Sequence, residues 1–395
     1  MEINPFILRK FAENKTYFAE NRLAIAMYIH QLRQWPRFTW QDEHLATLIS
    51  DIRYVQGRLA GRMDMLGFSA QQETSFLTLT QDVLKTSEIE GETLPLNEVR
   101  SSIARRLNID IGGLIPTDRA VDGVVDMLLD ATQAYDKPLS EDRLLGWQTA
   151  LFPAGRSGSY TIQTGRWRSD DTGPMQVVSG PLGRERVHFE APASERLGNE
   201  MTHFINWFNT EQSLDPILKS AIAHLWFVTI HPFDDGNGRI ARAIADMQLA
   251  RAERSCFRYY SLSAQIRLDR KAYYTLLERT QRGSLDITDW LVWFLNCLRR
   301  ALHQTEQQLA QVLTKAQVWS RFGDISLNDR QRLLINKLWD GFDGKLTSSK
   351  WAKIAKCSQD TASRDIQDLI QKGMLTKDEA GGRSTSYSLR DQTDL

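Results

Sequence analysis

Apolar residues recur with the period of an α-helix along most of this chain, and they seldom alternate with polar residues as they would in a β-strand. This pattern is the feature that most limits its fold. Between residues 42 and 66, apolar side chains recur every three or four residues, which is the repeat of one helix face. The same repeat returns along most of the 395 residues, whereas alternation of apolar and polar residues is confined to short segments. Because a half-buried β-strand needs a repeat of two, the sequence predicts a mostly α-helical protein.

Turn-rich breaks divide the chain into three predicted domains. Its length alone favours two or three domains. We predict a helical N-terminal region over residues 1–115, which ends in a break that contains two glycines and a proline. A larger helical domain is predicted over residues 116–315. Residues 326–395 predict three short helices and two short strands, the pattern of a winged helix-turn-helix.

Charge and cysteine content narrow the classes of protein further. Lys and Arg together number 49 and equal Asp and Glu, so bulk charge does not favour coating of nucleic acid or membrane. Cys256, Cys297 and Cys357 are odd in number and far apart, which excludes a disulfide framework and predicts thiols in a reducing compartment. No apolar run approaches the ~20 residues of a membrane span. We therefore expect a cytoplasmic protein with no membrane partner.

The segment HPFDDGNGRIAR, residues 231–242, concentrates polar chemistry between two helical patterns. Gly236 and Gly238 permit positive φ angles, so that consecutive backbone N–H groups can point inward and bind an anion. The N-terminus of the following helix reinforces such a site. Arg239 and Arg242 lie three residues apart on one face of that helix, where both can hold phosphate oxygens.

Two further side chains of the segment suit nucleotide chemistry. Asp235 places a hard oxygen ligand beside the anion site, and Mg²⁺ binds through one or two carboxylates together with phosphates. His231, with an ordinary pKa of ~6.5, can accept a proton at neutral pH. A solvated structural loop is the alternative interpretation. The combination within twelve residues favours a site for a nucleoside triphosphate.

This segment resembles the HxFx(D/E)GNGRxxR motif of Fic domain proteins at every defined position. The resemblance extends over about residues 117–300. Most members of that family transfer AMP from ATP to a Ser, Thr or Tyr hydroxyl of a target protein. The resemblance therefore implies a helical Fic core, ATP as substrate, Mg²⁺ as the metal and a target protein with an exposed hydroxyl as partner.

The resemblance also implies a role for each residue of the motif. His231 is expected to act as base on the target hydroxyl, and Phe233 to anchor the loop by burying its ring. Asp235 is expected to hold Mg²⁺. Arg239 is expected to reach the phosphates and steady the leaving pyrophosphate, and Arg242 to meet the γ-phosphate. The residues implied to bind the α- and β-phosphates are Gly236, Asn237 and Gly238.

A short β-hairpin is predicted within the larger domain, from residues 175–178 and 186–189. In Fic proteins such a flap aligns the target by adding a strand to its edge, which is β-augmentation. Ordinary hairpin packing is the alternative interpretation. The residues expected to dock the target are Val177, Val178, Val187 and His188.

A second motif lies upstream, around Glu90. Ser87 and Glu90 have the spacing of a capping box, which would begin a helix there. Gly91 and Pro95 make that a poor place for a helix to begin. The favoured interpretation ends the preceding helix at Gly91, and it places Glu90 in the last turn, where a carboxylate opposes the helix dipole. Such an unfavourable position suggests that Glu90 has a partner elsewhere.

The same residues resemble the (S/T)xxxE(G/N) motif of the inhibitory helix of Fic proteins. Thr86, Glu90 and Gly91 match it. In that family the glutamate pairs with the second motif arginine, here Arg242, and blocks the γ-phosphate. The resemblance implies the subclass with an N-terminal inhibitory helix in the same chain, and hence a self-inhibited protein adenylyltransferase. Some members also remove AMP, so the direction of the reaction stays open.

A DNA-binding regulator whose Fic core senses nucleotides is the alternative function. The predicted winged helix places Thr361, Ser363 and Arg364 on its second helix. Residues 326–395 hold twelve Lys or Arg against ten Asp or Glu, a small excess for a DNA-binding domain. Docking of another protein, or formation of a homodimer, through this domain is therefore at least as consistent with the sequence.

Overall fold

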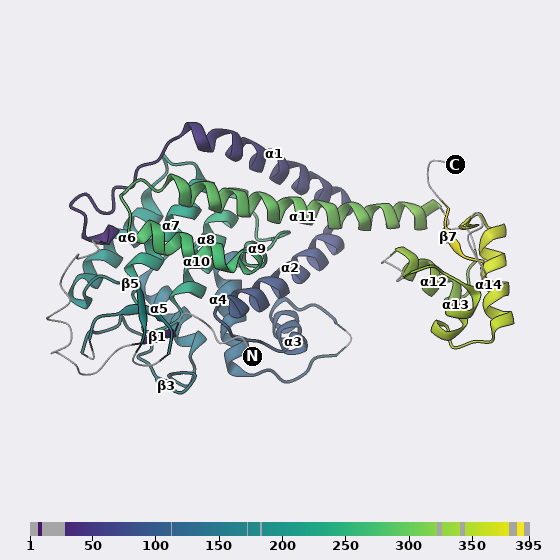
Figure 1. Ribbon diagram of the computed structural model, residues 1–395, viewed down its shortest axis with the longest axis horizontal. Helices are drawn as coiled ribbons and strands as arrows, with labels where there is room; N and C mark the ends of the chain where they lie inside the picture. Colours follow the sequence, from purple (N-terminus) through teal and green to yellow (C-terminus); the bar gives the residue numbers. More distant parts are fainter. Residues whose placement is uncertain are drawn as a thin grey trace. The chain divides into compact units, whose positions relative to one another are not determined.

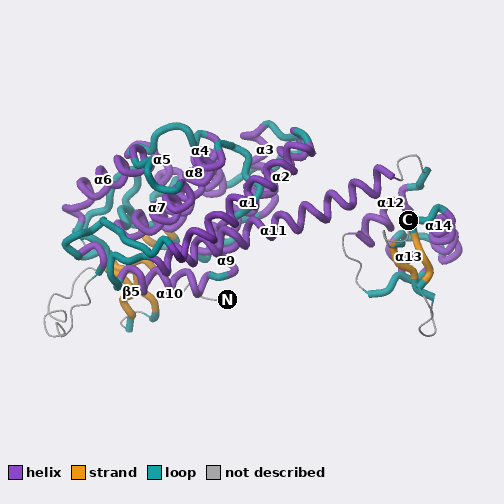
Figure 2. Tube along the Cα trace, turned by 90° about the horizontal axis from the view of Figure 1, so that it is seen from above, coloured by secondary structure: helices purple, strands orange, loops and turns teal. Residues whose placement is uncertain are grey.

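The chain folds into two compact units, residues 1–306 and 307–395. The computed structural model describes residues 7–9, 28–111, 113–171, 173–181, 184–321, 326–339, 344–378 and 385–390. Helices make up most of both units, and the strands are few and short (Figures 1 and 2). The predicted mostly α-helical class is thereby confirmed. The three predicted domains remain a prediction.

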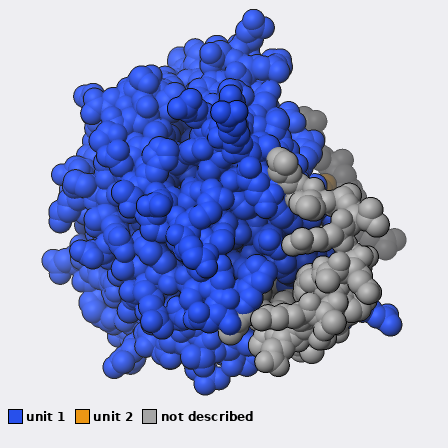
Figure 3. Space-filling view, turned by 90° about the vertical axis from the view of Figure 1, so that its left-hand side faces the viewer, with its two compact units in different colours: residues 1–306 blue, residues 307–395 orange. Residues whose placement is uncertain are grey.

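Eleven α-helices belong wholly or largely to the first unit in the described part of the chain, and one face of this unit is seen in Figure 3. The last of them continues beyond residue 306. Their bounds are α1 (Glu43–Leu66), α2 (Phe68–Ile89), α3 (Leu96–Leu107), α4 (Arg119–Gln133), α5 (Glu141–Leu151), α6 (Leu197–Thr210), α7 (Pro216–Ile230), α8 (Asn237–Glu253), α9 (Leu262–Leu268), α10 (Arg270–Gln281) and α11 (Thr288–Arg321).

Helix α7 forms the centre of the first unit. Its sequence is apolar on nearly every face, and every residue from Ile217 to Ile230 is buried. The Asp215 side chain caps the helix by accepting from the Ile217 N–H, and Pro216 fits the first turn, where no backbone N–H partner is needed. Helix α8 packs along α7. The loop between these two central helices, which carries the predicted site, is therefore held on a rigid base.

A three-stranded antiparallel sheet lies beside the helices. Its order is β1 (Ile7–Arg9), β4 (Gln176–Ser179) and β5 (Arg186–Glu190). Strands β4 and β5 form the predicted hairpin, with a register irregularity between Val177 and Val178. Strand β1 was not expected from the sequence, because three residues are too few to show alternation. A separate two-stranded sheet joins β2 (Arg156–Ser157) and β3 (Tyr160–Thr161).

Some local expectations need correction. Helix α3 begins at Leu96, directly after Pro95, and no side chain caps it, although Asn97 is of a residue type that favours the cap position. Helix α9 was not expected, because seven residues show less than two full turns of periodicity. Helix α11 runs to Arg321 through residues that include no Gly or Pro. None of the described helices combines the length and the apolar character that a bilayer crossing needs.

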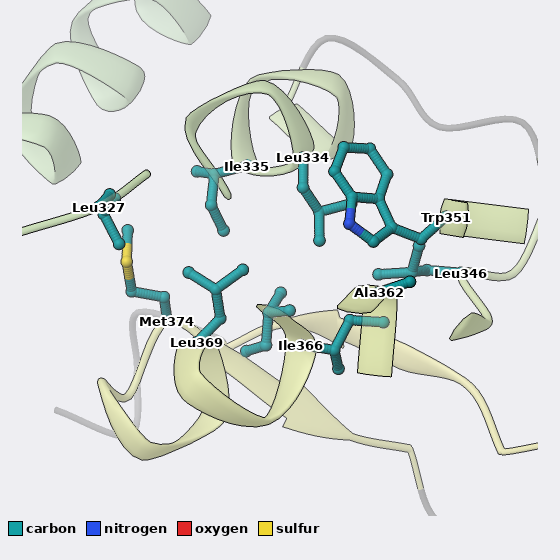
Figure 4. Close-up of a cluster of buried hydrophobic side chains, with 10 residues drawn as sticks. Leu327, Leu334, Ile335, Leu346, Trp351, Ala362, Ile366, Leu369 and Met374 are labelled. Atoms are coloured by element: carbon teal, nitrogen blue, oxygen red, sulfur yellow. The ribbon is translucent and has the colours of Figure 1, made fainter. Parts of the chain in front are cut away.

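The second unit contains the predicted three helices and two strands. A cluster of buried apolar side chains, among them Leu334, Trp351, Ile366 and Leu369, forms its core (Figure 4). These elements agree with a winged helix-turn-helix, which remains an interpretation. Their bounds are α12 (Asp329–Trp339), α13 (Ser348–Ile354), α14 (Gln359–Gln371), β6 (Leu375–Lys377) and β7 (Tyr387–Leu389).

Candidate active site

His231 ends helix α7 in a left-handed backbone conformation, with φ 53° and ψ 59°. A residue with a Cβ atom seldom adopts this conformation, and when it does the position is often functional. Arg168 holds the strained turn: its Nε donates to the His231 carbonyl oxygen at 2.8 Å, and its backbone N–H donates to the Pro232 oxygen at 2.9 Å. The Arg168 side chain is fully buried. The sequence alone did not point to Arg168, because Arg168 lies 63 residues before His231 and outside the motif.

The His231 imidazole is arranged as a neutral base. Its Nδ1 lies 3.1 Å from the Val228 carbonyl oxygen, which can only accept, so Nδ1 carries the proton. Its Nε2 is buried without a hydrogen-bond partner among the described residues. Burial lowers the pKa of His231 to about 4, an effect that outweighs the opposing influence of the Val228 carbonyl. At neutral pH the unprotonated Nε2 can therefore accept a proton.

The loop after His231 is braced from inside. Phe233 is fully buried, and its ring centroid lies 5.1 Å from that of Trp167, as expected for an anchor. The Asn237 side chain accepts from the Phe233 N–H at 3.0 Å and donates to the Phe233 oxygen at 2.8 Å. Both polar ends of Asn237 thus fix the loop. Its implied role as a phosphate ligand stays a prediction.

The N-terminus of helix α8 presents a small, glycine-lined recess. Gly236 has φ +91°, and a Cβ atom there would lie 3.0 Å from the Phe152 ring. A Cβ atom at Gly238 would lie only 2.3 Å from a carboxylate oxygen of Glu90. The Gly236 N–H donates at 2.6 Å to a carboxylate oxygen of Asp235, so an anionic group already sits at this helix end.

The first motif arginine, Arg239, is buried in this recess. Its guanidinium carbon lies 5.0 Å from the centroid of the Phe152 ring, a cation–π distance. Its Nη1 donates at 2.6 Å to the carboxylate of Glu92. Its Nε is buried without a partner among the described residues. Arg239 is therefore positioned, and it retains a donor for another acceptor.

The second motif arginine, Arg242, is 1% exposed and binds the end of helix α2. Its Nη2 donates to a Glu90 carboxylate oxygen at 2.7 Å and to the Thr86 carbonyl oxygen at 2.9 Å, and its Nε donates to the Thr86 hydroxyl at 2.7 Å. The predicted ion pair between Glu90 and Arg242 is thus present. Burial raises the pKa of Glu90, but Arg242 and neighbouring arginines more than offset that effect, so the pKa lies below its ordinary value and Glu90 is ionised.

The capping-box interpretation of Ser87 and Glu90 is wrong. Helix α2 ends at Ile89, Glu90 is its C-cap, and Gly91 follows with φ +87°. Ser87 is fully buried within the last turn. The expected helix end at Gly91 is confirmed, and the partner that the unfavourable position of Glu90 suggested is Arg242.

A cavity of about 350 Å³ joins these groups. His231, Asp235, Arg239, Glu90 and Glu92 all contribute to its wall, and Tyr273 and Tyr274 contribute aromatic surface. The buried side-chain atoms without partners among the described residues include one acceptor, Nε2 of His231, and two donors, Nε of Arg239 and Nη1 of Arg242. This is the size and chemistry of a site for a phosphorylated ligand with an apolar portion.

The predicted flap contributes Val177 and His188 to the cavity wall, while Val178 is buried and Val187 is half-buried. Strand β1 pairs with β4, with Ile7 opposite Val178, so residues of this chain occupy that edge of the flap. On β5, Arg282 donates to the carbonyl oxygens of Val187 and His188 at 2.7 and 2.9 Å. Target docking by these four residues stays a prediction.

Sequence comparison identifies two regions of the chain. Residues 138–249 match the Fic/DOC family, and residues 28–109 match a domain of unknown function, DUF4172. The chain is 35% identical over 229 residues to "Protein adenylyltransferase Fic" of Aedes aegypti, which covers 56% of this chain and 40% of that protein. It is 25% identical over 233 residues to the protein of the same name from Nematostella vectensis, over 56% and 47% of the two chains. The chain thus spans less than half the length of these relatives.

Structural comparison agrees on the fold. A crystal structure of a Fic family protein from Desulfovibrio desulfuricans G20 aligns with 90% of this chain and 98% of its own, with a TM-score of 0.52 and 21% sequence identity. The residues that match the Fic/DOC family, 138–249, include helix α7, the loop that follows it and most of helix α8. Residues 138–249, which hold the His231 to Arg242 motif in full, match the Fic/DOC family.

Proposed function

We propose that the protein is a self-inhibited adenylyltransferase, which transfers AMP from ATP to a Ser, Thr or Tyr hydroxyl of a target protein. The observation that carries the proposal is a cavity lined by His231, Arg239 and Gly238 at the N-terminus of α8, with Nε2 of His231 left without a hydrogen-bond partner among the described residues. The match of residues 138–249 to the Fic/DOC family and the relatives named protein adenylyltransferase support transfer of AMP.

In the proposed reaction, His231 accepts a proton, and Arg239 and the N-terminus of α8 stabilise charge. The hydroxyl oxygen of the target bonds to the α-phosphorus of ATP, and the bond from that phosphorus to the bridging oxygen breaks. His231 Nε2 takes the hydroxyl proton, and pyrophosphate leaves with the displaced electron pair. Arg239 and the α8 N-terminus stabilise the negative charge that develops on the phosphates, because positioning and charge neutralisation dominate such transfers.

Mg²⁺ would bind at this site together with ATP, and Asp235 would be its protein ligand. One Asp235 oxygen accepts from the Gly236 N–H at 2.6 Å, and the other accepts from the Ser157 hydroxyl, so the carboxylate is oriented at the cavity wall. No cluster of three metal-binding side chains occurs among the described residues. Mg²⁺ typically binds through one or two carboxylates together with phosphate oxygens and water, so the single carboxylate of Asp235 would suffice as protein ligand.

We expect Asp235→Ala to weaken nucleotide binding only when Mg²⁺ is present. Isothermal titration with ATP in the presence of Mg²⁺ or of a chelator measures this directly. The variant should lose most of the gain in affinity that Mg²⁺ gives the unsubstituted protein. Asp234→Ala is the matched control, because the neighbouring carboxylate accepts from the Gln163 N–H instead. An equal Mg²⁺ dependence in all three proteins contradicts the ligand role.

The lowered pKa of His231 predicts the pH dependence of transfer. An ordinary histidine of pKa ~6.5 loses roughly three quarters of its unprotonated form at pH 6. With a pKa of about 4, His231 stays unprotonated, so kcat/KM should be flat between about pH 6 and pH 8. The folded pKa lies below the unfolded value, so neutral His231 also contributes stability that is lost as the pH falls from about 6.5 toward 4. A decline of activity centred near pH 6.5 contradicts the assigned state of the base.

Incubation of the Glu90→Gly protein with labelled ATP and Mg²⁺ in a whole lysate tests the proposed reaction and identifies the target. We expect one or a few labelled protein bands that depend on His231. The same residues can serve the removal of AMP from a modified target, so purified AMP-modified target is the second substrate to offer. If Glu90→Gly neither labels a protein nor removes AMP from the modified target, the proposal is contradicted.

Binding of DNA by the second unit is a second candidate function, which one observation favours. Asp365, which would repel DNA if exposed, is buried and accepts from Arg330 Nε at 2.8 Å. Asp368 accepts from Gln331 and from Lys372. Arg364 on the same helix is exposed. The exposed face of α14 is therefore less acidic than its sequence suggests.

Salt-dependent retention of the 395-residue chain on duplex DNA tests this candidate. We expect Arg364→Glu to weaken retention if α14 contacts DNA. Arg332→Glu on α12 makes the same charge change in the same unit and serves as the control. Retention that is absent at low salt contradicts DNA binding and leaves the second unit as a docking domain for proteins.

A further inference from the structure

Each of the two motif arginines is paired with its own carboxylate. Arg242 binds Glu90, and Arg239 Nη1 binds a Glu92 oxygen at 2.6 Å. The family motif around Glu90 accounts for the first pair only. Glu92 lies in the wall of the same cavity as His231 and Asp235, so it borders the space where a triphosphate would bind.

The end of helix α2 explains why both carboxylates face helix α8. The Gly91 N–H donates to the Glu88 oxygen at 3.1 Å, and the Glu92 N–H donates to the Ser87 oxygen at 3.0 Å. With Gly91 at φ +87°, these are the bonds of a Schellman motif, which turns the chain back across the helix end. The turn fixes Glu90 on one side of Gly91 and Glu92 on the other, each within reach of one arginine.

We propose that Glu92 is a second inhibitory carboxylate, which holds Arg239 while Glu90 holds Arg242. This inference rests on the proposed function, because it assumes that Arg239 binds the phosphates of ATP. In the resting protein both arginines are then neutralised. A triphosphate must displace Glu92 from Arg239 as well as Glu90 from Arg242.

The surroundings of Arg239 make Glu92 a competitor of the ligand. The Arg239 guanidinium is buried and lies against the Phe152 ring as well as against Glu92, so we expect removal of Glu92 to leave a positioned cation. Burial raises the pKa of Glu92, Arg239 lowers it, and the nearby carboxylates of Asp235 and Glu90 raise it, so that the pKa lies above its ordinary value. A triphosphate adds more negative charge to the same space and repels Glu92 toward solvent.

The ion pairs Glu92–Arg239 and Glu90–Arg242 should differ in strength. The Glu92 side chain is 45% exposed and that of Glu90 is 26% exposed, so solvent screens the Glu92 pair more. Arg242 is also held by Thr86, whereas Arg239 has no further hydrogen-bond partner among the described residues. The Glu92 ion pair is therefore the weaker of the two, and removal of Glu92 should increase the affinity for a triphosphate less than removal of Glu90.

Titration with α,β-methylene ATP, which cannot release pyrophosphate, tests the inference without any requirement for transfer. In the Glu90→Gly background, Glu92→Ala should tighten binding of this analogue about two- to fivefold in the presence of Mg²⁺. Glu92→Gln should tighten it as well, because the amide lacks the competing charge. Binding of AMP, which lacks the β- and γ-phosphates, should change less.

Glu88→Gln is the matched control. Glu88 lies on the same helix end and loses the same charge, but it pairs with Lys85 and Arg267 rather than with a motif arginine. We expect no gain from this control, and we expect Arg239→Ala to remove the gain produced by Glu92→Ala. Equal affinities for the Glu92→Gln and Glu88→Gln proteins, or weaker binding by both Glu92 variants, overturn the inference alone. Failure of every variant, Glu90→Gly included, to bind the analogue overturns the proposed function too.

Discussion

Replacement of Glu90 by glycine should raise transfer of AMP by at least about tenfold. The carboxylate occupies Arg242 at 2.7 Å, and Arg242 is the residue expected to hold the γ-phosphate. With the γ-phosphate bound there, the α-phosphate can lie in line with the incoming hydroxyl. Each ~1.4 kcal/mol of recovered transition-state stabilisation gives a tenfold rate. Initial rates of label incorporation into the target, or into the protein itself, measure the effect.

Glu90→Gly should also lower the free energy of unfolding of the protein without nucleotide. Loss of Glu90 leaves Arg242 buried and without its anion, which costs about 1–3 kcal/mol. ATP with Mg²⁺ supplies a replacement anion, so thermal denaturation of Glu90→Gly should show a low melting temperature that the nucleotide restores. Addition of Arg242→Ala should remove the gain in rate. Equal activity and equal ATP affinity in Glu90→Gly and the unsubstituted protein would mean that residues 86–91 only end a helix.

Replacement of His231 by alanine in the Glu90→Gly background should abolish transfer and leave nucleotide binding largely intact. The imidazole acts on the target hydroxyl, whereas the phosphates meet the arginines and the α8 N-terminus. Loss of the base alone should reduce the rate by about 10²–10⁴-fold. The comparison needs both an activity assay and a titration with ATP.

Arg168→Lys separates the role of the imidazole from that of the loop that carries it. Lysine keeps the charge but cannot repeat the bonds from Arg168 to the oxygens of His231, Asp170 and Pro192. We expect this variant to lose part of the activity and part of the stability. His231→Ala that transfers AMP at the rate of its parent would show that another group takes the proton.

The sequence predicted those parts of the site that are contiguous in the chain. Residues 231–242 span one loop and one helix start, so their spacing alone places His231, Asp235 and the arginines together. The end of α2 was also predictable, because Gly91 is a residue that tolerates a positive φ and Glu90 opposes the helix dipole. Both signals are local.

The contributions that the sequence did not predict come from distant segments. Arg168 supports the His231 turn from 63 residues away, and no periodicity or motif marks it. Strand β1 is too short to show alternation, and its pairing with β4 depends on the fold as a whole. Glu92 lies one residue beyond a recognisable motif, yet only the turn at Gly91 brings it to Arg239. Such contacts depend on tertiary packing rather than on local propensity.

Peptide mass spectrometry after incubation of Glu90→Gly with ATP and Mg²⁺ tests the central claim most directly. The account predicts a mass increase of one AMP on a Ser, Thr or Tyr side chain of the target or of the protein itself. The increase should be far smaller in the unsubstituted protein and absent in Glu90→Gly with His231→Ala. A modification that is equal in all three proteins, or that is absent from Glu90→Gly while ATP binds, contradicts a self-inhibited adenylyltransferase.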